Sequence, residues 1–285
     1  MGIRPKVDII LCCYNQERFI GEAVNSIIRQ KIDADVRVLV ADDSSPDSTL
    51  EIIKRLEVES PFQFDYLQSD HNIGFVANYQ RAFAACRGDY VAILEGDDRW
   101  ETADHLAQHV NFLEHHPHFS MSFNRMYYYF QENGRKIVHS WPYKNDFYKL
   151  KLRDTIVYGN QIGNLSACCF RRKFLQMLPE IFFEHYIADW EIGMIMASHG
   201  PIGRLKKPTS LYRINNMGQW SGMDKKAMLR SQFDTLKLMK PFLPKYCLLY
   251  YPLAKRNIKR GIDRPYPRSW KTKIKEIKSK IRIQP

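Results

Sequence analysis

Acidic side chains gather in residues 94–100, which read LEGDDRW. The run before them, residues 90–94 (YVAIL), is apolar and rich in β-forming side chains, so it predicts a buried strand. Glu95 and Asp97 then project to one side of the strand end, where they could share an ion. Carboxylate oxygens suit Mg²⁺ or Mn²⁺, and a cation held there would stabilise the charge that develops on a diphosphate leaving group.

Two earlier candidate strands, residues 7–13 (VDIILCC) and 36–41 (VRVLVA), also run into polar side chains. Asp, Asn and Ser favour turns, so any one of these clusters has a purely structural explanation. Three such clusters at successive strand ends instead suggest one shared site. The side chains that follow the two earlier strands are Tyr14, Asn15, Asp42 and Asp43.

The elements that must position these residues alternate in type through the first hundred residues. This alternation predicts an α/β fold with an open, mostly parallel central sheet and helices on both faces. Ligands bind such sheets at the carboxyl ends of the strands. Strand-like runs cover residues 7–13, 36–41, 62–67 and 90–94, and apolar residues recur at helical spacing over 19–28, 50–56 and 75–85.

Downstream the regular alternation is lost. We expect one large domain over residues 1–223, in two halves (1–100 and 101–223), and a basic helical region over 224–285. The expected elements are a helix at 105–113, a long strand at 119–130 with a return strand at 136–140, a buried strand at 166–170, a helix from 188, and helices at 224–240, 245–260 and 270–281.

The amino-acid composition indicates a folded protein and excludes several other classes. The 285 residues are 45% apolar and 13% aromatic, which is enough to build a core and excludes disorder for most of the chain. No apolar run approaches the roughly 18 to 20 residues that span a bilayer, and the first residues lack the apolar core of a signal peptide. We therefore expect a cytosolic protein, whose six cysteines, without CxxC spacing, are reduced core thiols.

The order of these motifs resembles glycosyltransferase family 2. PKVDIILCCYNQERFIGEAVNSIIRQ is similar to the family's opening strand and helix, VLVADDSSPDST to its second nucleotide-contacting loop, and DHNIGFVANYQRAFAACRGDYVAILEGDD to the run into the metal motif. The resemblance implies a GT-A fold and an inverting, metal-dependent sugar transfer from a nucleotide diphosphate, with uridine diphosphate as the expected nucleotide. It makes residues 1–223 the catalytic domain, with 1–100 as the nucleotide-binding half and 101–223 as the acceptor half. The family has Asp-x-Asp or a close variant where this chain has Glu95, so Asp97 is the safer metal ligand.

The resemblance also implies roles for individual residues. Tyr14 and Asn15 would lie by the base and ribose, and Asp42 or Asp43 would accept hydrogen bonds from uracil or ribose. Asp98 would bind metal through water or orient the donor sugar. The residues expected to line the same donor pocket are Asn72, Gly74, Asn78 and Arg81.

The segment HYIADWEIGMIMASHGPIGRLKKPTSLYRIN resembles the part where inverting members place a carboxylate at a helix start, followed by a strand and a Tyr-Arg pair. Inverting transfer needs one base to take the acceptor's proton and no protein nucleophile. Asp189 is the candidate base, although it could merely cap the helix, and Glu191 is the nearest rival. Arg213 could clamp the diphosphate or form an ordinary salt bridge. Asn164-Leu165-Ser166 matches a glycosylation acceptor pattern without meaning in the cytosol.

Other classes fit the sequence less well. A sugar nucleotidyltransferase would have a glycine-rich loop with a basic end after the first strand, and an NAD-dependent oxidoreductase would have GxGxxG there, whereas this chain has CYNQERF. A noncatalytic glycan-binding or scaffold protein would have no need of the acids at 95, 97, 98 and 189.

The net charge of +12 belongs to the C-terminal region, because residues 225–285 hold 18 Lys or Arg against 3 acids. Nothing there resembles a nucleic-acid-binding motif, so we expect no nucleic-acid partner. The apolar residues at 248–253 and the isoleucines of 274–283 instead suggest helices that dock on an anionic membrane surface, at its inner face. The alternative is a helical appendage packed on the catalytic domain or on a second subunit.

Overall fold

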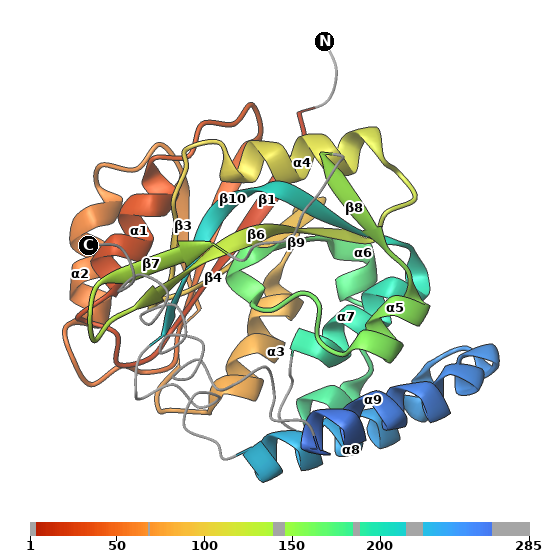
Figure 1. Ribbon diagram of the computed structural model, residues 1–285. Coiled ribbons are helices and arrows are strands. Elements are labelled where there is room, and N and C mark those ends of the chain that lie inside the picture. Colours follow the sequence, from red (N-terminus) through yellow and green to blue (C-terminus); the bar gives the residue numbers. More distant parts are fainter. Residues whose placement is uncertain (1–3, 68, 139–145, 185–188, 215–224, 264–285) are drawn as a thin grey trace, which may run out of the picture.

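The structure of the protein is a computed structural model that describes residues 4–67, 69–138, 146–184, 189–214 and 225–263 (Figure 1). Ten strands form one sheet, in the order β3-β2-β1-β4-β9-β6-β10-β5, with β7 paired to β6 and β8 paired to β10. The α/β class predicted from the sequence is confirmed.

The first half alternates strand and helix as predicted, because each helix buries its apolar stripe on the sheet that its neighbouring strands build. β1 pairs in parallel with β2 on one side and with β4 on the other. The elements are β1 (Lys6–Cys13), α1 (Ile20–Ile28), β2 (Asp35–Asp42), α2 (Thr49–Glu57), β3 (Gln63–Tyr66), α3 (Phe75–Ala85) and β4 (Tyr90–Glu95).

The core has two layers because alternate residues of each strand face opposite sides of the sheet. On β1, Ile9 and Leu11 pack with α1 and α4, whereas Ile10 and Cys12 pack with α3 and the helices of the second half. All six cysteines are buried and free, as expected. Both faces of the central strands are therefore covered, which is the condition for a stable parallel sheet.

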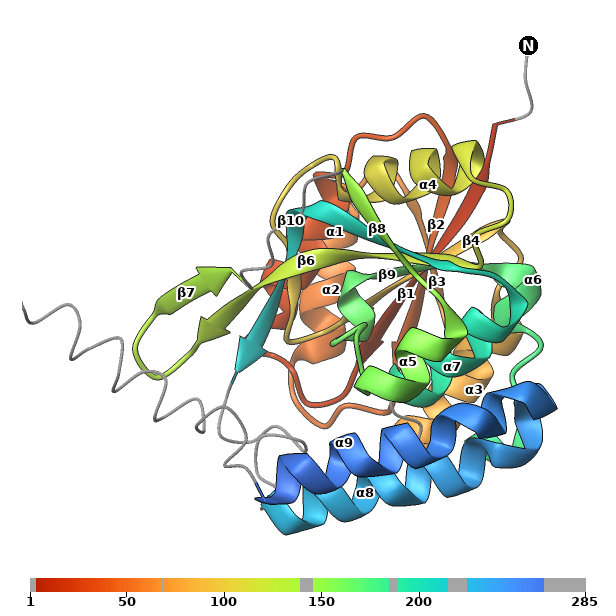
Figure 2. The ribbon, with the colours of Figure 1, turned by 45° about the vertical axis from the view of Figure 1, so that its right-hand side comes forward.

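The second half completes the sheet with longer and partly antiparallel strands. β6 forms the predicted hairpin with β7, which extends away from the body of the molecule (Figure 2). β9 is antiparallel to both β4 and β6, and β10 runs parallel to β6. The elements are β5 (Arg99–Trp100), α4 (His105–His115), β6 (Met121–Phe130), β7 (Arg135–Val138), β8 (Phe147–Leu150), α5 (Leu152–Tyr158), the 3₁₀ turn η1 (Leu165–Ala167), β9 (Cys168–Arg171), α6 (Arg172–Leu175), η2 (Glu180–Phe183), α7 (Asp189–His199) and β10 (Ile202–Ile214).

Residues 225–263 pack on the α3 side of the sheet, where α8 and α9 lie side by side below α5 and α7 (Figure 2). Leu236, Tyr251 and Ile258 are buried in the same core as α7, so the apolar face of α9 is used for packing and is not available to a membrane. The elements are α8 (Lys225–Met239), η3 (Lys240–Phe242), η4 (Lys245–Tyr250) and α9 (Tyr251–Asp263). The helix expected at 270–281 lies outside the described residues, and the boundary at residue 223 stays a prediction.

Every helix in the described part of the chain is too short or too polar to cross a membrane.

Candidate active site

The parallel register brings the three polar clusters to one edge of the sheet. Cys13 of β1 pairs with Asp42 of β2, and Cys12 pairs with Glu95 of β4, so the loops that follow these strands begin side by side. Two residues in these loops, Asn15 (φ 56°) and Ser44 (φ 60°), adopt the left-handed conformation that is rare outside glycine. Such strained positions concentrate at functional sites, where surrounding contacts hold them.

Glu95 ends β4 inside a cluster of acids. Its carboxylate accepts hydrogen bonds from the Tyr79 hydroxyl (3.3 Å) and from Asn164 Nδ2 (3.0 Å). Burial, together with the negative charges of Asp98, Asp97 and Asp189, raises the pKa of Glu95 well above its ordinary value. The acids therefore lie close enough to repel one another, and binding a cation among them would relieve that repulsion.

Asp98 is fully buried and is held by the protein itself. Ser166 Oγ donates to Asp98 Oδ2 (2.7 Å), and the backbone N–H of Arg213 donates to Oδ1 (2.9 Å). Burial and the neighbouring charge of Asp97 raise the pKa of Asp98 well above its usual range. These contacts favour a role for Asp98 in ordering the loop. Its predicted role toward a metal or a donor sugar stays a prediction.

Asp97 and Glu95 are half-buried, whereas Asp98 is buried. Asp97 and Glu95 are therefore the acids of the motif that a ligand can reach. Within the described residues, no three His, Cys, Asp or Glu side chains form a set that could hold a metal by themselves. A Mg²⁺-type ion needs only one or two carboxylates when substrate phosphates supply further ligands. The oxygen donors present therefore fit a divalent cation bound jointly by Asp97, Glu95 and a diphosphate.

Asp189 begins α7 beside this cluster and receives a hydrogen bond from the side chain of Asn160. Burial and the charge of Glu191 raise the pKa of Asp189 to about 7. A carboxyl group with that pKa is divided between its two protonation states near neutral pH, as a general base requires. Glu191, the rival candidate, points into the core and accepts a hydrogen bond from Thr235 Oγ1 (2.5 Å).

Asp43, one of the predicted nucleotide-binding residues, holds the loop before α3. Both carboxylate oxygens of Asp43 accept backbone N–H groups, from Ile73 (2.8 Å) and Gly74 (2.9 Å), so this acid fixes the loop before α3. Gly74 has φ +88° and open space where a Cβ would stand. Asp43 therefore places that loop against the end of β2.

Asn78 and Arg81 of α3 hydrogen-bond to the backbone at the end of β2. Asn78 Nδ2 donates to the Ala41 carbonyl (2.7 Å), and Arg81 donates to Asn78 Oδ1 (2.8 Å) and to the Asp42 carbonyl (2.6 Å). By contrast, Tyr14 and Asn72 are exposed at the rim, where contact with a ligand is open to them. The structure thus brings the predicted donor residues together, and their contacts with a nucleotide stay predictions.

The guanidinium of Arg213 is buried and bound to protein groups, which differs from the exposed position expected of a diphosphate clamp. Its side chain is 2% exposed, and its guanidinium donates to the Asp97 carbonyl (2.7 Å), to Gln131 (2.6 Å) and to Glu22 (2.9 Å). The guanidinium also lies over the rings of Phe19 and Tyr129. This geometry favours the alternative of an ordinary salt bridge, formed with Glu22, which is 45% exposed, while the bond to the Asp97 carbonyl supports the acid loop.

Sequence reasoning missed several residues that hold the acids. In the sequence Asn164 and Ser166 match only a glycosylation pattern, yet Ser166 Oγ accepts from the Glu95 N–H (3.1 Å) and both side chains bind the acid cluster. The sequence motifs do not include Tyr79 and Asn160, which bind Glu95 and Asp189. The available signal was the polar NLS tripeptide directly before a buried apolar strand.

Comparison with known proteins supports this picture. The sequence profile of the family described as Glycosyl transferase family 2 matches residues 8–178. An uncharacterized protein of Mycobacterium tuberculosis is 28% identical over 219 residues, which cover 75% of this chain and 60% of that protein. EpsE of Bacillus subtilis, named as a glycosyltransferase, is 31% identical over 144 residues, which cover 50% of this chain and 51% of EpsE. The chain thus spans about 60% of the length of the first of these relatives and about half of the length of the second.

Solved structures share the fold. TarS of S. aureus in complex with UDP-GlcNAc superimposes with a TM-score of 0.62 at 20% identity, covering 82% of this chain and 65% of that one. The mannosyltransferase PcManGT of Pyrobaculum calidifontis, in complex with GDP-Man and Mn²⁺, gives a TM-score of 0.59 at 18% identity, covering 94% and 76%. The expected GT-A fold is confirmed.

Proposed function

This chain belongs to glycosyl transferase family 2, and we propose that it transfers a sugar from a nucleotide diphosphate to a hydroxyl group of a glycan or lipid-linked glycan, with inversion at the anomeric carbon. The observation that carries the proposal is the meeting of Glu95, Asp97, Asp98 and Asp189 beside the loops of β1 and β2. One site thus offers ligands for a cation, a base of suitable pKa and a place for a nucleotide. Uridine diphosphate is the preferred nucleotide.

Each group of the site has a defined task in this reaction. Asp189 takes the proton of the acceptor hydroxyl as that oxygen attacks, and no protein nucleophile is needed for a single in-line displacement. Asp97, with Glu95, would hold Mn²⁺ or Mg²⁺, which supplies positive charge to the leaving diphosphate. Asn160 and the acid-binding side chains of Asn164 and Ser166 fix the geometry of these carboxylates.

A donor screen tests the reaction class. Uridine, guanosine and thymidine diphosphate sugars are incubated with the protein with and without Mn²⁺, and the released nucleotide diphosphate is measured. Metal-dependent release is the expected result, whereas pyrophosphate release from nucleoside triphosphates would indicate a nucleotidyltransferase. Binding of a nucleotide sugar without any turnover, with a panel of glycan acceptors present, would indicate a binding module.

A pair of matched carboxylate variants tests the base. Asp189→Asn should lower turnover by roughly a hundredfold or more with donor affinity near normal, because only proton removal is lost. Glu191→Gln should retain most of its turnover, because Glu191 faces Thr235 in the core. If Glu191→Gln gives the large loss and Asp189→Asn does not, the base is Glu191.

We also propose that the C-terminal region docks on an anionic membrane surface, at its inner face if the chain works in the cytosol. Three apolar side chains of η4 are exposed, Leu249 (78%), Tyr246 (58%) and Leu248 (38%). They lie directly before α9, whose exposed side carries Lys255, Arg256 and Lys259. Exposed apolar residues next to basic ones are the pattern of an interfacial surface, where each basic residue adds about 1 kcal/mol.

Vesicle sedimentation tests this docking. Leu249→Glu should weaken binding to vesicles that contain anionic lipid, added salt should weaken it further, and removal of residues 262–285 should reduce it without loss of donor hydrolysis. Val58→Glu is the matched control, because Val58 is 83% exposed on the far α2 side. Equal binding of all these proteins would refute the docking, and a change in oligomeric state in Leu249→Glu would instead assign the surface to a second subunit.

A further inference from the structure

A series of alternating charges runs from the β6–β7 hairpin toward the acid motif. It begins at Lys136 of β7, whose ammonium binds Glu101, and Glu101 also accepts a hydrogen bond from Arg99 (2.7 Å). Arg99 in turn binds Glu22 of α1, and Glu22 accepts from Arg213 of β10 (2.9 Å). These five side chains form one ion-pair chain, in which each carboxylate lies between two cations.

The ion-pair chain joins elements that are far apart in the sequence. The pair of Arg99 and Glu22 spans 77 residues, and that of Arg213 and Glu22 spans 191. An isolated surface ion pair contributes little, but several charges that share partners in a partly buried place hold one another in position. The side chains of Arg213, Glu101 and Arg99 are 2%, 15% and 27% exposed, so water screens this chain only in part.

One end of the ion-pair chain holds the acid loop, residues 95–98. Arg213 Nε donates to the Asp97 carbonyl (2.7 Å), and the backbone N–H of the same residue donates to Asp98 Oδ1 (2.9 Å). Because a guanidinium is planar and rigid, its bond to Glu22 also fixes the direction in which Nε meets the Asp97 carbonyl. The position of Asp97 therefore depends on a carboxylate of α1.

The β6–β7 hairpin contacts the ion-pair chain at both of its ends. The ammonium of Lys136 lies 4.2 Å from the centre of the Tyr127 ring. Gln131, which follows β6, accepts a hydrogen bond from the Arg213 guanidinium (2.6 Å), and that guanidinium lies 5.3 Å from the centre of the Tyr129 ring. A displacement of the hairpin would therefore reach the group that holds the acid loop.

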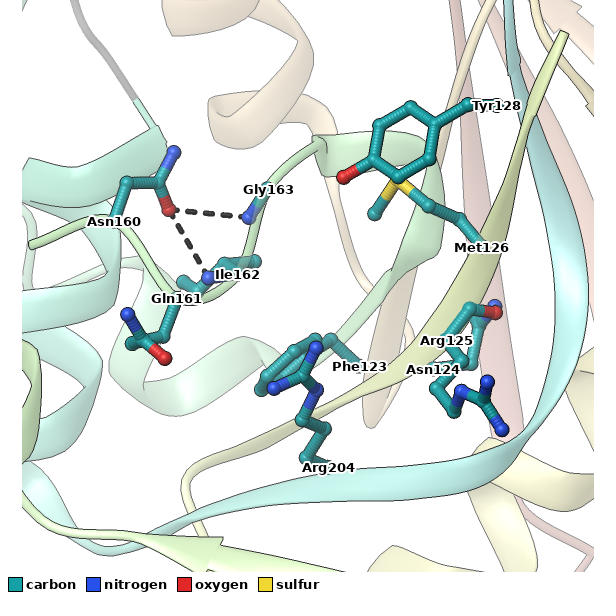
Figure 3. Close-up of a pocket in the computed structure, with 10 residues that line it drawn as sticks. All are labelled: Phe123, Asn124, Arg125, Met126, Tyr128, Asn160, Gln161, Ile162, Gly163 and Arg204. Atoms are coloured by element: carbon teal, nitrogen blue, oxygen red, sulfur yellow. Dashed lines mark hydrogen bonds between the residues drawn. The ribbon is translucent and has the colours of Figure 1, made fainter. Parts of the chain in front are cut away.

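The opposite face of β6 serves a different part of the site. Met126 and Tyr128 alternate with the two tyrosines under the ion-pair chain and line a small cavity together with the loop of residues 160–163 (Figure 3). Asn160, which lines the same cavity, holds the candidate base. The ion-pair chain can therefore be altered without contact to the base.

We propose that the ion-pair chain positions the acid loop for binding a metal ion with a diphosphate, and that the β6–β7 hairpin sets this position from outside the site. The inference rests on the proposed transferase function. Removing contacts that orient metal-binding side chains weakens metal affinity by about 10- to 100-fold. The positioning residues, which act through Arg213 on Asp97, are Glu22, Arg99, Glu101 and Lys136.

Binding of Mn²⁺ in the presence of uridine diphosphate, followed by electron paramagnetic resonance on the full chain, tests the middle of the ion-pair chain. Glu22→Gln keeps the size of the side chain but removes the charge that two arginines share, so Mn²⁺ should bind about tenfold more weakly. Glu22→Asp keeps the charge and should retain part of the affinity. Glu51→Gln changes an exposed acid of α2 and is the matched control, which should bind as the parent does.

Variants of Lys136 test the reach of the hairpin. Lys136→Gln should weaken Mn²⁺ binding by about two- to fivefold, the effect of losing one partly exposed ion pair. Lys136→Glu should weaken it further, because the new charge would repel Glu101, whereas Lys136→Arg should bind nearly as the parent does. Equal Mn²⁺ binding by the parent, Glu22→Gln and Lys136→Glu would overturn the inference.

Amide hydrogen exchange on the metal-free protein gives a readout that needs neither metal nor turnover. Residues 96–99 should exchange faster in Glu22→Gln and Lys136→Glu than in the parent, whereas α2 should be unchanged. A lower melting temperature with parental exchange in this loop would show that the ion-pair chain only stabilises the fold, and would refute the positioning role. If Glu22→Gln does not fold, the Lys136 variants decide the matter. If the parent itself does not bind Mn²⁺ with uridine diphosphate, the proposed function has failed, and exchange in the loop alone decides the inference.

Discussion

Replacement of Asp189 by Asn should remove activity and yet stabilise the protein at alkaline pH. In the unfolded chain this carboxyl group ionises near pH 3.9, whereas in the folded protein its pKa is about 7. Between these values the folded state binds more protons than the unfolded state, so the contribution of Asp189 to the free energy of unfolding falls as pH rises. Above pH 7 the folded protein carries the full cost of ionising this half-buried group.

The magnitude follows from the two pKa values. Each pH unit between them corresponds to about 1.4 kcal/mol, so the upper bound is about 4 kcal/mol. Water at the half-buried side chain screens part of this, and about 1 to 2 kcal/mol is a reasonable expectation. For a chain of this size the Asn variant should melt a few degrees higher than the parent at pH 8.

Thermal unfolding from pH 4 to pH 8, with EDTA present to exclude bound metal, measures this difference. The two proteins should melt together near pH 4, and the advantage of the variant should grow toward pH 8. Asp70→Asn, a change at an exposed acid, is the matched control and should show no such trend. A variant that is less stable than the parent at every pH would refute the reasoning, because it would mean that the charge of Asp189 is well compensated.

Three further changes probe the acid cluster. Asp97→Ala should abolish metal-dependent turnover with little change in melting temperature, because a half-buried acid at a strand end contributes little to packing, and full activity of a folded variant would remove Asp97 from the metal site. Ser166→Ala should cost about 1 to 3 kcal/mol in chemical denaturation, since it removes the hydroxyl that donates to Asp98 Oδ2 and accepts from the Glu95 N–H; an unchanged midpoint would contradict this. Gly96→Ala should destabilise by about 1 to 3 kcal/mol in the same assay, because the new Cβ would lie 2.9 Å from Cys13 Cβ and 3.1 Å from Ile20 Cδ1, and parental stability would show that these neighbours yield freely.

Sequence patterns predicted the first half of the fold well because its information is local. α3 has the predicted bounds, 75–85, and β4 extends the predicted strand by one residue, to Glu95, since apolar spacing over a few turns is enough to define each element. Parallel pairing of neighbours then follows from short connections. Because parallel strands end at the same edge of a sheet, this pairing alone brings the three polar clusters together.

The second half was predicted less well because its key contacts join residues far apart in the chain. The hydrogen bond from Ser166 to Asp98 spans 68 residues, and that from the Arg213 backbone to Asp98 spans 115. The position of Asn164-Leu165-Ser166 beside the acids depends on β9, which pairs antiparallel with both β4 and β6. Burial of Arg213 likewise depends on Glu22, which lies in the first helix.

The acid motif itself joins the two halves of the sheet, and this has a consequence for how the protein is made. Glu95 ends β4, whereas Arg99 and Trp100 form β5, which pairs with Leu211 and Ser210 of β10 at the far end of the strand order. During synthesis, strands β1 to β4 and their loops are available once about a hundred residues have emerged, and domains tend to fold from the N-terminus. The carboxylates cannot reach their final arrangement until more than a hundred further residues have been translated and β10 has docked. A nascent or truncated chain would therefore gain the loops after β1 and β2 well before its acid cluster is complete.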